Sequence, residues 1–430
     1  MLTGNGGREN AIAWKIFNSD SFKRASGKLF AADGNPGISG FAEIVKIKPA
    51  DIKSLVEFSK KEKIDFIVTG SEIPLSLGIT DEFEKNGFKI FGPSKAAAEI
   101  ETSKVFAKGL MEDNGIPTAK YRMFTSDEFE SASDFLNSCS YPVVFKADGL
   151  AAGKGVIIAK DFAESIEAVK NFCEGRILKD SGSKFILEEF IAGEEISVFA
   201  VTDGGDYVIL PFSQDHKREA EGETGRNTGG MGAVAPVEKY MTDEMTQKIK
   251  SRIIDPVLKA MKKLGREFKG CLYCGLIISE NEPYVIEFNC RFGDPETQSV
   301  LPLIKSDFLE LLISSAEKNI RNYKLEINNE YSCCVVLASG GYPGKYETGK
   351  IVSGIENTGN DCIVFHSGTE FSGENKTLIT NGGRVISVVG VSENSLNEAV
   401  KIAYDNSAKI NFENKYFRKD IGFRQIKNQQ

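Results

Sequence analysis

Two oxygen-bearing side chains lie two positions apart in a segment that we expect to form a strand, residues 284–289. Side chains alternate across a strand, so Glu287 and Asn289 should face the same side of the sheet. Their oxygens suit Mg²⁺, which takes one or two carboxylates and completes its shell with phosphate oxygens and water. Arg291 and Asp294 follow in a turn rich in Gly and Pro. This pattern favours a metal–nucleotide site, and the alternative is that Glu287 pairs with a buried arginine.

Two lysines flank a glycine-bearing turn that joins two short expected strands, as in a hairpin flap. Lys146 ends the first strand within Phe-Lys-Ala-Asp-Gly, and Lys154 lies between Gly153 and Gly155. Lysines beside such a turn can hold the charge of a polyphosphate, because glycine lets the backbone approach an oxygen closely. The segment is not a Walker A motif. Solvated surface lysines on a hairpin are the alternative reading.

The chain opens on a short strand and a glycine-rich turn that leads into a helix. The backbone amides of such a turn and the helix N-terminus suit an anionic phosphate. The turn departs from the dinucleotide pattern GxGxxG, because Glu9 stands at the third glycine position. We expect a phosphate site here, with a merely tight turn as the alternative and an NAD-linked oxidoreductase as the rival enzyme class. The residues of this loop are Gly4, Asn5, Gly6, Gly7, Arg8 and Glu9.

Two polar segments lie between these motifs. Residues 214–218 read Gln-Asp-His-Lys-Arg, and residues 227–232 read Asn-Thr-Gly-Gly-Met-Gly. The second could present amides to an anion, or it could be an ordinary connector. His216 is either functional or a satisfied structural histidine.

Composition excludes several classes of protein. The chain has 430 residues and a formal net charge of -8, whereas nucleic-acid and membrane-surface binders need a positive surface. It contains no apolar stretch of about 18 residues, so we expect a cytoplasmic protein with no membrane or nucleic-acid partner. Eight thinly spread cysteines should be reduced, and two histidines make a His-centred triad improbable.

The order of expected elements indicates more than one domain. Strand-like and helical runs alternate over the first 93 residues, which predicts a doubly wound parallel sheet. A single helix over residues 99–114 should follow, and another over 243–263. The last hundred residues are β-rich with one helix near 396–406. The fold class is therefore α/β and α+β multidomain.

Taken in order, these segments give the chain a strong family likeness. The matching stretches are GNGGRE, FKADGLAAGKGV, EEFIAGEE, QDHKR, NTGGMGA, IEFNCRFGDPETQ, ASGGYPG, TNGGRV and RKDIGFR. They resemble the phosphoribosylamine–glycine ligase (glycinamide ribonucleotide synthetase) family of the ATP-grasp superfamily. The resemblance implies ATP-dependent joining of glycine to 5-phosphoribosylamine, through a glycyl phosphate, in purine biosynthesis. It also implies Mg²⁺ or Mn²⁺. We expect a monomer, with a dimer as the alternative.

The order of expected elements, together with the resemblance, predicts four regions. They are an N-terminal substrate domain (1–98), an ATP-grasp core (99–116 and 188–327), a mobile lid (117–187) and a β-rich C-terminal domain (328–430).

The resemblance also implies residue roles. Glu287 and Asn289 would hold the metal, Arg291 would stabilise the transferred phosphoryl group, and Lys154 would act from the flap. Nucleotide contacts are implied for Lys104, Lys146, Gly153, Gly155, Glu188, Glu189, Phe190, Ile191, Glu195, Lys217 and Asn227. Substrate contacts are implied for the loop from Gly4 to Glu9 and for Glu72, Asp215 and Asp294.

Two positions depart from the family pattern. Asn10 stands where a histidine is usual, and Ser71 replaces a common proline before Glu72. The first change should alter affinity for the ribosylamine rather than abolish function. A nucleotide-binding regulatory module without catalysis remains a further alternative, distinguished by its failure to release phosphate.

Overall fold

The computed structural model describes residues 1–150, 155–176 and 184–427. Its N-terminal part is a five-stranded parallel sheet in the order β3-β2-β1-β4-β5, which confirms the doubly wound arrangement. The strands are β1 (Leu2–Gly4), β2 (Phe30–Asp33), β3 (Glu43–Val45), β4 (Phe66–Thr69) and β5 (Lys89–Phe91). The main helices are α1 (Gly7–Asn18), α3 (Ile52–Glu62), α4 (Glu72–Leu77) and α5 (Ile79–Lys85).

The expected single helix over 99–114 is wrong, because the structure has two helices there. Helix α6 (Lys95–Thr102) ends at Ser103, and α7 (Lys104–Asp113) begins directly after it. Ser103 has an extended backbone, and its hydroxyl accepts a hydrogen bond from the Phe106 amide at 3.0 Å. The hydroxyl also donates to the Asp148 carboxylate at 3.0 Å. The N-terminus of α7, and with it Lys104, is thereby tied to the loop that follows the strand carrying Lys146.

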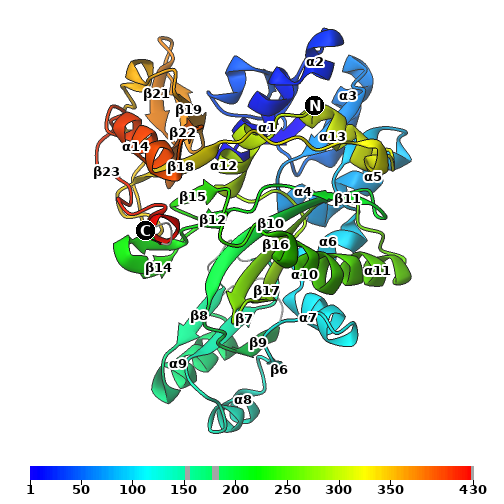
Figure 1. Ribbon diagram of the computed structural model, residues 1–430, viewed down its shortest axis with the longest axis vertical. Helices are drawn as coiled ribbons and strands as arrows, with labels where there is room; N and C mark the ends of the chain where they lie inside the picture. The colour runs from blue at the N-terminus through cyan, green and yellow to red at the C-terminus, as the bar shows by residue number, and fades with distance from the viewer. Residues whose placement is uncertain (151–154, 177–183, 428–430) are drawn as a thin grey trace.

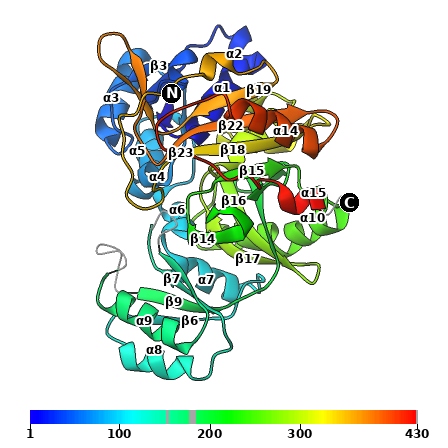
Figure 2. The ribbon, with the colours of Figure 1, turned by 90° about the vertical axis from the view of Figure 1, so that its left-hand side faces the viewer.

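A second body carries its own antiparallel sheet, in the order β6-β9-β7-β8. Its elements are β6 (Tyr121–Thr125), α8 (Phe129–Leu136), β7 (Val143–Ala147), β8 (Val156–Ala159), α9 (Phe162–Cys173) and β9 (Lys184–Glu189). The pairing of β7 with β8 confirms the hairpin expected around the lysines. Phe124, Phe145, Phe172 and Phe185 form a separate apolar core for this body. In both views it lies at the opposite end of the molecule from the N-terminal sheet (Figures 1 and 2).

The central sheet is antiparallel, in the order β11-β10-β16-β17. Its strands are β10 (Glu194–Thr202), β11 (Tyr207–Ile209), β16 (Gly270–Ser279) and β17 (Glu282–Asn289). The helix expected over 243–263 is interrupted: α10 (Asp243–Ile249) continues through a π turn (Lys250–Ile254) into α11 (Asp255–Lys263). The three segments pack their apolar faces on the same core as the sheet.

The C-terminal sheet is built from two distant parts of the chain. Strands β12 (Gln214–Asp215) and β15 (Gly232–Ala235) pair onto β18 (Tyr331–Ser339), which continues to β22 (Arg384–Ser392) and β19 (Cys362–His366). Helix α12 (Glu296–Leu303) packs against β15 and β18, and α14 (Leu396–Ser407) covers β18 and β22. Further elements are the hairpin β13–β14 (Arg218–Ala220, Thr224–Asn227), α13 (Phe308–Ala316) and α15 (Phe423–Lys427). None of the helices in the described part of the chain is both long and apolar enough to cross a membrane.

Candidate active site

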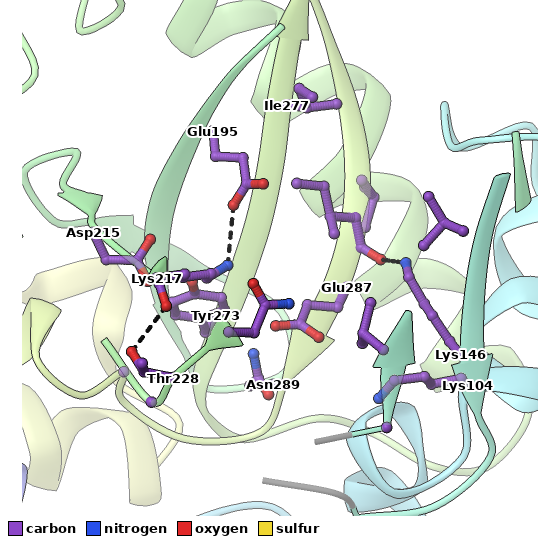
Figure 3. A pocket seen from close by; sticks show the side chains of 18 of the residues that line it. Lys104, Lys146, Glu195, Asp215, Lys217, Thr228, Tyr273, Ile277, Glu287 and Asn289 are labelled. Atoms are coloured by element: carbon purple, nitrogen blue, oxygen red, sulfur yellow. Dashed lines mark hydrogen bonds and ion pairs between the residues drawn. The ribbon is translucent and has the colours of Figure 1, made fainter. Parts of the chain in front are cut away.

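A cavity of about 450 Å³ opens between the central sheet, the β6–β9 body and the loops that lead to α12 (Figure 3). It is lined by most of the residues singled out from the sequence. These are Arg8, Glu72, Lys104, Lys146, Gly155, Glu188, Glu189, Phe190, Ile191, Glu195, Asp215, Lys217, Asn227, Glu287, Asn289, Arg291 and Asp294. Gly4, Asn5, Gly6, Gly7 and Glu9 are not among the lining residues. Gly153 and Lys154 lie outside the described residues.

Glu287 and Asn289 lie on one face of β17, as the alternation predicts. They pair in register with Gly275 and Tyr273 of β16, and both line the cavity. Figure 3 places them between Lys217 on one side and Lys104 and Lys146 on the other. Among the described residues, neither side chain has a hydrogen-bond or ion-pair partner. Two oxygen-bearing groups are thus left free at the cavity wall.

The charge of Glu287 is well defined. Burial opposes its ionisation, but Lys217, Lys104, Lys146 and Arg291 together lower the pKa of this carboxyl to about 2. The carboxylate is therefore ionised at neutral pH and has unused acceptor sites. An ionised carboxylate beside an amide oxygen fits a hard divalent cation that keeps positions open for phosphate oxygens. The residues present thus match the Mg²⁺ site expected from the sequence.

Lys146 is held by a buried acidic residue. Its Nζ lies 2.8 Å from Glu188 Oε2 and donates to the Ile286 carbonyl at 2.9 Å. On the other side of Glu188, Lys108 Nζ lies 3.1 Å from Oε1. Burial lowers the pKa of Lys108 to about 8, although Glu188 opposes the shift. Glu188 thus lines the cavity, and its side chain fixes two lysines.

Two carboxylates fix the orientation of the Arg291 side chain. Its Nε lies 3.2 Å from Glu72 Oε2, and its Nη2 lies 3.1 Å from Glu101 Oε1. Glu101 also accepts a hydrogen bond from the Cys290 amide at 2.7 Å. Burial opposes ionisation of Glu72, but Arg291 and Arg8 outweigh it and lower the pKa of the carboxyl to about 2. The arginine is consequently fixed in orientation at the end of β17.

The buried Asp215 and the partly exposed Lys217 lie on the opposite wall (Figure 3). Burial raises the pKa of Asp215, and the nearby carboxylates Glu296, Glu195 and Glu287 add to the rise against the opposing effect of Lys217. Lys217 Nζ lies 3.3 Å from Glu195 Oε2. Burial opposes its charge, yet Asp215 and Glu195 raise the pKa of Lys217 well above its usual value. Lys217 is therefore a permanent cation amid several acids.

One end of the cavity is apolar. Phe190 and Ile191 follow β9, and Val144, Ile158 and Ile277 complete the lining there. Phe190 keeps 43% of its surface exposed, which is unusual for a phenylalanine and leaves its ring available to a ligand. An apolar slot beside backbone groups suits a flat heterocycle.

The glycine-rich opening loop is closed by its own carboxylate. The Glu9 side chain accepts a hydrogen bond from the Gly6 amide at 2.7 Å and pairs with Arg8 Nε at 2.6 Å. The Arg8 amide donates to Asp294 Oδ2 at 3.4 Å. Two of the amides expected to bind an anion thus already face carboxylates. The phosphate role of this loop stays a prediction, and the structure gives it no support.

Asn10, one of the two positions that depart from the family pattern, and His216 have structural partners. Asn10 is fully buried, and its Oδ1 accepts a hydrogen bond from the His366 amide at 2.7 Å. Ser71 precedes α4 without a side-chain capping bond. His216 is buried, and its Nε2 accepts from the Gly422 amide at 3.2 Å. Burial lowers the pKa of His216 to about 3, so the ring is neutral and structural.

Several cavity residues escaped the sequence analysis. Tyr273 donates its hydroxyl hydrogen bond to Glu296 Oε1 at 2.9 Å, and Ser197 lies within 3.1 Å of the same oxygen. Glu101 and Arg384 also line the cavity. Strand alternation in β16 could have indicated Tyr273. Arg384 lies in the stretch TNGGRV, which contributed to the family resemblance, but the resemblance assigned no role to any residue of that stretch.

The fold and site define the class, and comparison with known proteins defines the family. A model of the phosphoribosylglycinamide synthetase ATP-grasp (A) domain matches residues 102–297, so the chain is an ATP-grasp protein. Models of the N and C domains of the same synthetase match residues 1–101 and 332–424. The chain belongs to the phosphoribosylglycinamide synthetase family.

Individual relatives agree with this assignment. A phosphoribosylamine–glycine ligase of Caldanaerobacter subterraneus is 44% identical over 98% of each chain. The Escherichia coli K12 protein of the same name is 42% identical over 100% of this chain and 99% of its own. A crystal structure of phosphoribosylamine–glycine ligase from Thermotoga maritima has a TM-score of 0.82 at 32% identity and covers 98% of this chain and 99% of its own.

Proposed function

We propose that this chain uses ATP to ligate glycine to 5-phosphoribosylamine, giving glycinamide ribonucleotide, ADP and phosphate. The observation that carries the proposal is the unpartnered pair Glu287 and Asn289, facing a cavity ringed by four cations in a chain of this family. We place this activity in the cytoplasm, as a step of purine biosynthesis, by analogy with the family.

The proposed arrangement of nucleotide follows the two ends of the cavity. Adenine would lie in the apolar slot beside Phe190 and Ile191, with the ribose hydroxyls near Glu195. The phosphates would then extend towards Lys104 and Lys146. A Mg²⁺ ion held by Glu287 and Asn289 would neutralise charge on the phosphate that is transferred. Phosphoryl transfer depends mainly on positioning and charge neutralisation, which this set of residues supplies.

The proposed chemistry has two steps. First, an oxygen of the glycine carboxylate forms a bond to the γ-phosphorus while the bond to ADP breaks, giving glycyl phosphate. Next, the ribosylamine nitrogen forms a bond to the carbonyl carbon, the nitrogen loses a proton, and phosphate leaves. Arg291, held by Glu72 and Glu101, would stabilise the transferred group through its guanidinium.

Water would destroy the acyl phosphate, so the site must close during turnover. The body formed by β6 to β9 has its own apolar core and contributes Val144, Lys146 and Ile158 to the cavity. We infer that this body serves as the lid by moving as a unit. Its extent, residues 117–187, remains a proposal.

Phosphate release assayed with each substrate omitted in turn tests the proposed function. We expect release only when ATP, a divalent cation, glycine and phosphoribosylamine are all present. Release at the same rate with alanine in place of glycine would contradict the substrate assignment. Nucleotide binding with no release under any condition would instead favour a regulatory module.

A further inference from the structure

Arg384, the first residue of β22, uses only part of its guanidinium within the protein. Its Nη1 donates to the carbonyls of Gly229 at 2.6 Å and Asp294 at 2.8 Å, and lies 3.2 Å from Asp294 Oδ1. Its Nε and Nη2 have no acceptor among the residues that the structure describes. Arg384 also lines the cavity. One nitrogen thus anchors the side chain, and the other two remain available to a ligand.

A second arginine lies beside the same segment of chain. Arg218 of β13 is paired in register with Asn227 of β14, lines the cavity, and donates from Nη1 to the Gly225 carbonyl at 2.9 Å. Like Arg384, it keeps two nitrogens without an acceptor in the described part of the chain. The segment 227–229, which also lines the cavity, therefore has an arginine on each side.

Most other cations of the cavity are already matched by carboxylates. Lys146 pairs with Glu188 and Lys217 with Glu195. The remaining pairs are Arg8 with Glu9, Arg291 with Glu72 and Glu101, and Arg424 with Glu223. Lys104 has no such partner, but it acts on Glu287 at the expected nucleotide end. Arg384 also pairs with Asp294, but through Nη1 alone, so guanidinium nitrogens without an acceptor in the described part of the chain remain on both sides of residues 227–229.

We propose that Arg384, assisted by Arg218, binds the phosphate monoester of the ribosylamine substrate. This inference rests on the proposed function and adds a subsite to it. A guanidinium matches phosphate oxygens in a planar, bidentate manner, and Arg384 is held rigidly by two backbone carbonyls. The phosphates of ATP have Lys104, Lys146 and the metal site instead.

The opening glycine loop is the competing location for this phosphate. There the incoming anion would meet the Glu9 carboxylate, which already accepts the hydrogen bond of the Gly6 amide. Two negative charges at the same amide repel each other, so Glu9 would have to move away before the phosphate could bind. At the other location Asp294 already pairs with Arg384 Nη1, but Nε and Nη2 of Arg384 and two nitrogens of Arg218 have no acceptor among the described residues. These nitrogens can meet an anion without displacing a carboxylate, which favours this part of the cavity.

The test measures ligand binding to the full-length chain by titration calorimetry, without catalysis. The probes are ribose 5-phosphate, ribose and Mg-ATP, and the variants are Arg384→Ala and Arg384→Lys. We expect the affinity for ribose 5-phosphate to fall by about 10- to 100-fold, because charge-assisted hydrogen bonds to the phosphate are lost. Affinities for ribose and Mg-ATP should stay within about twofold of wild type. Lysine should restore part of the lost affinity, since it keeps the charge but not the fork.

Arg226→Ala is the matched control. Arg226 lies on β14 and pairs with Glu219 at 2.7 Å, but it is not among the residues that line the cavity. Its substitution should leave all three affinities unchanged. Arg218→Ala provides a second variant should Arg384→Ala fail to fold, and it should lower ribose 5-phosphate affinity selectively as well.

Three results would overturn the inference. They are an unchanged affinity for ribose 5-phosphate in both Arg384 variants, an equal loss of affinity for Mg-ATP, and an equal loss for ribose. If the wild-type protein binds no ribose 5-phosphate, the inference is tested by the KM for phosphoribosylamine. That KM must rise in the Arg384 variants while the KM for ATP stays unchanged, and any other result overturns the inference. If the wild-type protein binds ribose 5-phosphate but makes no product, the proposed function is refuted while the proposed phosphate subsite is still supported.

Discussion

Replacing Glu287 by glutamine removes one negative charge from the cavity wall and changes the shape of the side chain very little. The folded protein lowers the pKa of this carboxyl from 4.5 to about 2. At about 1.4 kcal/mol per pKa unit, the charged form is favoured by about 3 kcal/mol in the folded state. We therefore expect Glu287→Gln to lower the free energy of unfolding of the metal-free protein by up to about 3 kcal/mol at pH 7.

The pH dependence of that difference has a definite sign. A carboxyl whose pKa is lower in the folded state stabilises the protein fully above its unfolded pKa, about 4.5, and loses this contribution as the pH falls towards 2. Urea unfolding of wild type and Glu287→Gln should show the full difference at pH 7 and about half of it near pH 3. A constant difference across this range would show that the charge of Glu287 is not its source.

The same variant should lose activity more severely than stability. If Glu287 is the metal ligand that we propose, its removal should reduce kcat/KM by about 100-fold or more, since even residues behind such ligands cost 10- to 100-fold. Mg-ADP should raise the melting temperature of wild type but raise that of the variant much less. Glu282→Gln is the control, because Glu282 lies at the other end of β17 and pairs with Lys248 at 2.9 Å. Equal activity of Glu287→Gln and wild type in saturating Mg²⁺ would refute the metal role.

Three further predictions concern the surroundings of the cavity. Glu101→Gln should lower kcat by about 10- to 100-fold with an unchanged KM for ATP, whereas Glu99→Gln on the same helix should match wild type in steady-state assays. Burial lowers the pKa of His216 to about 3 and that of His366 to about 4, so on acidification these histidines are protonated first in the unfolded chain. The free energy of unfolding should therefore fall by about 1.4 kcal/mol per pH unit per histidine below about pH 6.5. A flat urea-unfolding profile between pH 7 and 5 would exclude this. Tyr273→Phe should destabilise the protein by about 1–2 kcal/mol in the same assay, through loss of its bond to Glu296.

The sequence predicted features that depend on neighbouring residues. Alternation along one strand placed Glu287 and Asn289 together correctly, because the period of a strand is a local property. The glycine turn after Lys146 likewise indicated the hairpin of β7 and β8. The helix predicted over 99–114 covers α7, but the break at Ser103 was missed, because it depends on contact between Ser103 and Asp148, which lie 45 residues apart.

The undetected part of the site depends on tertiary contacts. Glu101 reaches Arg291 from a helix 190 positions away in the chain, and no local pattern marks it. Arg384 contacts Asp294 across 90 residues. The sequence predicted a phosphate-binding loop in which Glu9 stands in place of a glycine. In the structure, the Glu9 carboxylate itself accepts a hydrogen bond from the Gly6 amide of that loop. The sequence alone does not identify the ion-pair partner of a charged residue, because that partner is set by how the sheets pack together.

The segment around α15 completes the wall of the cavity that carries Lys217. Gly422 donates to His216 across 206 residues, and the buried Arg418 bonds to Glu223 at 2.7 Å across 195. During synthesis on the ribosome, the ATP-grasp strands emerge long before these two residues. A growing chain can therefore fold its N-terminal and central sheets early, but it cannot finish the binding surface until nearly all of it has been translated.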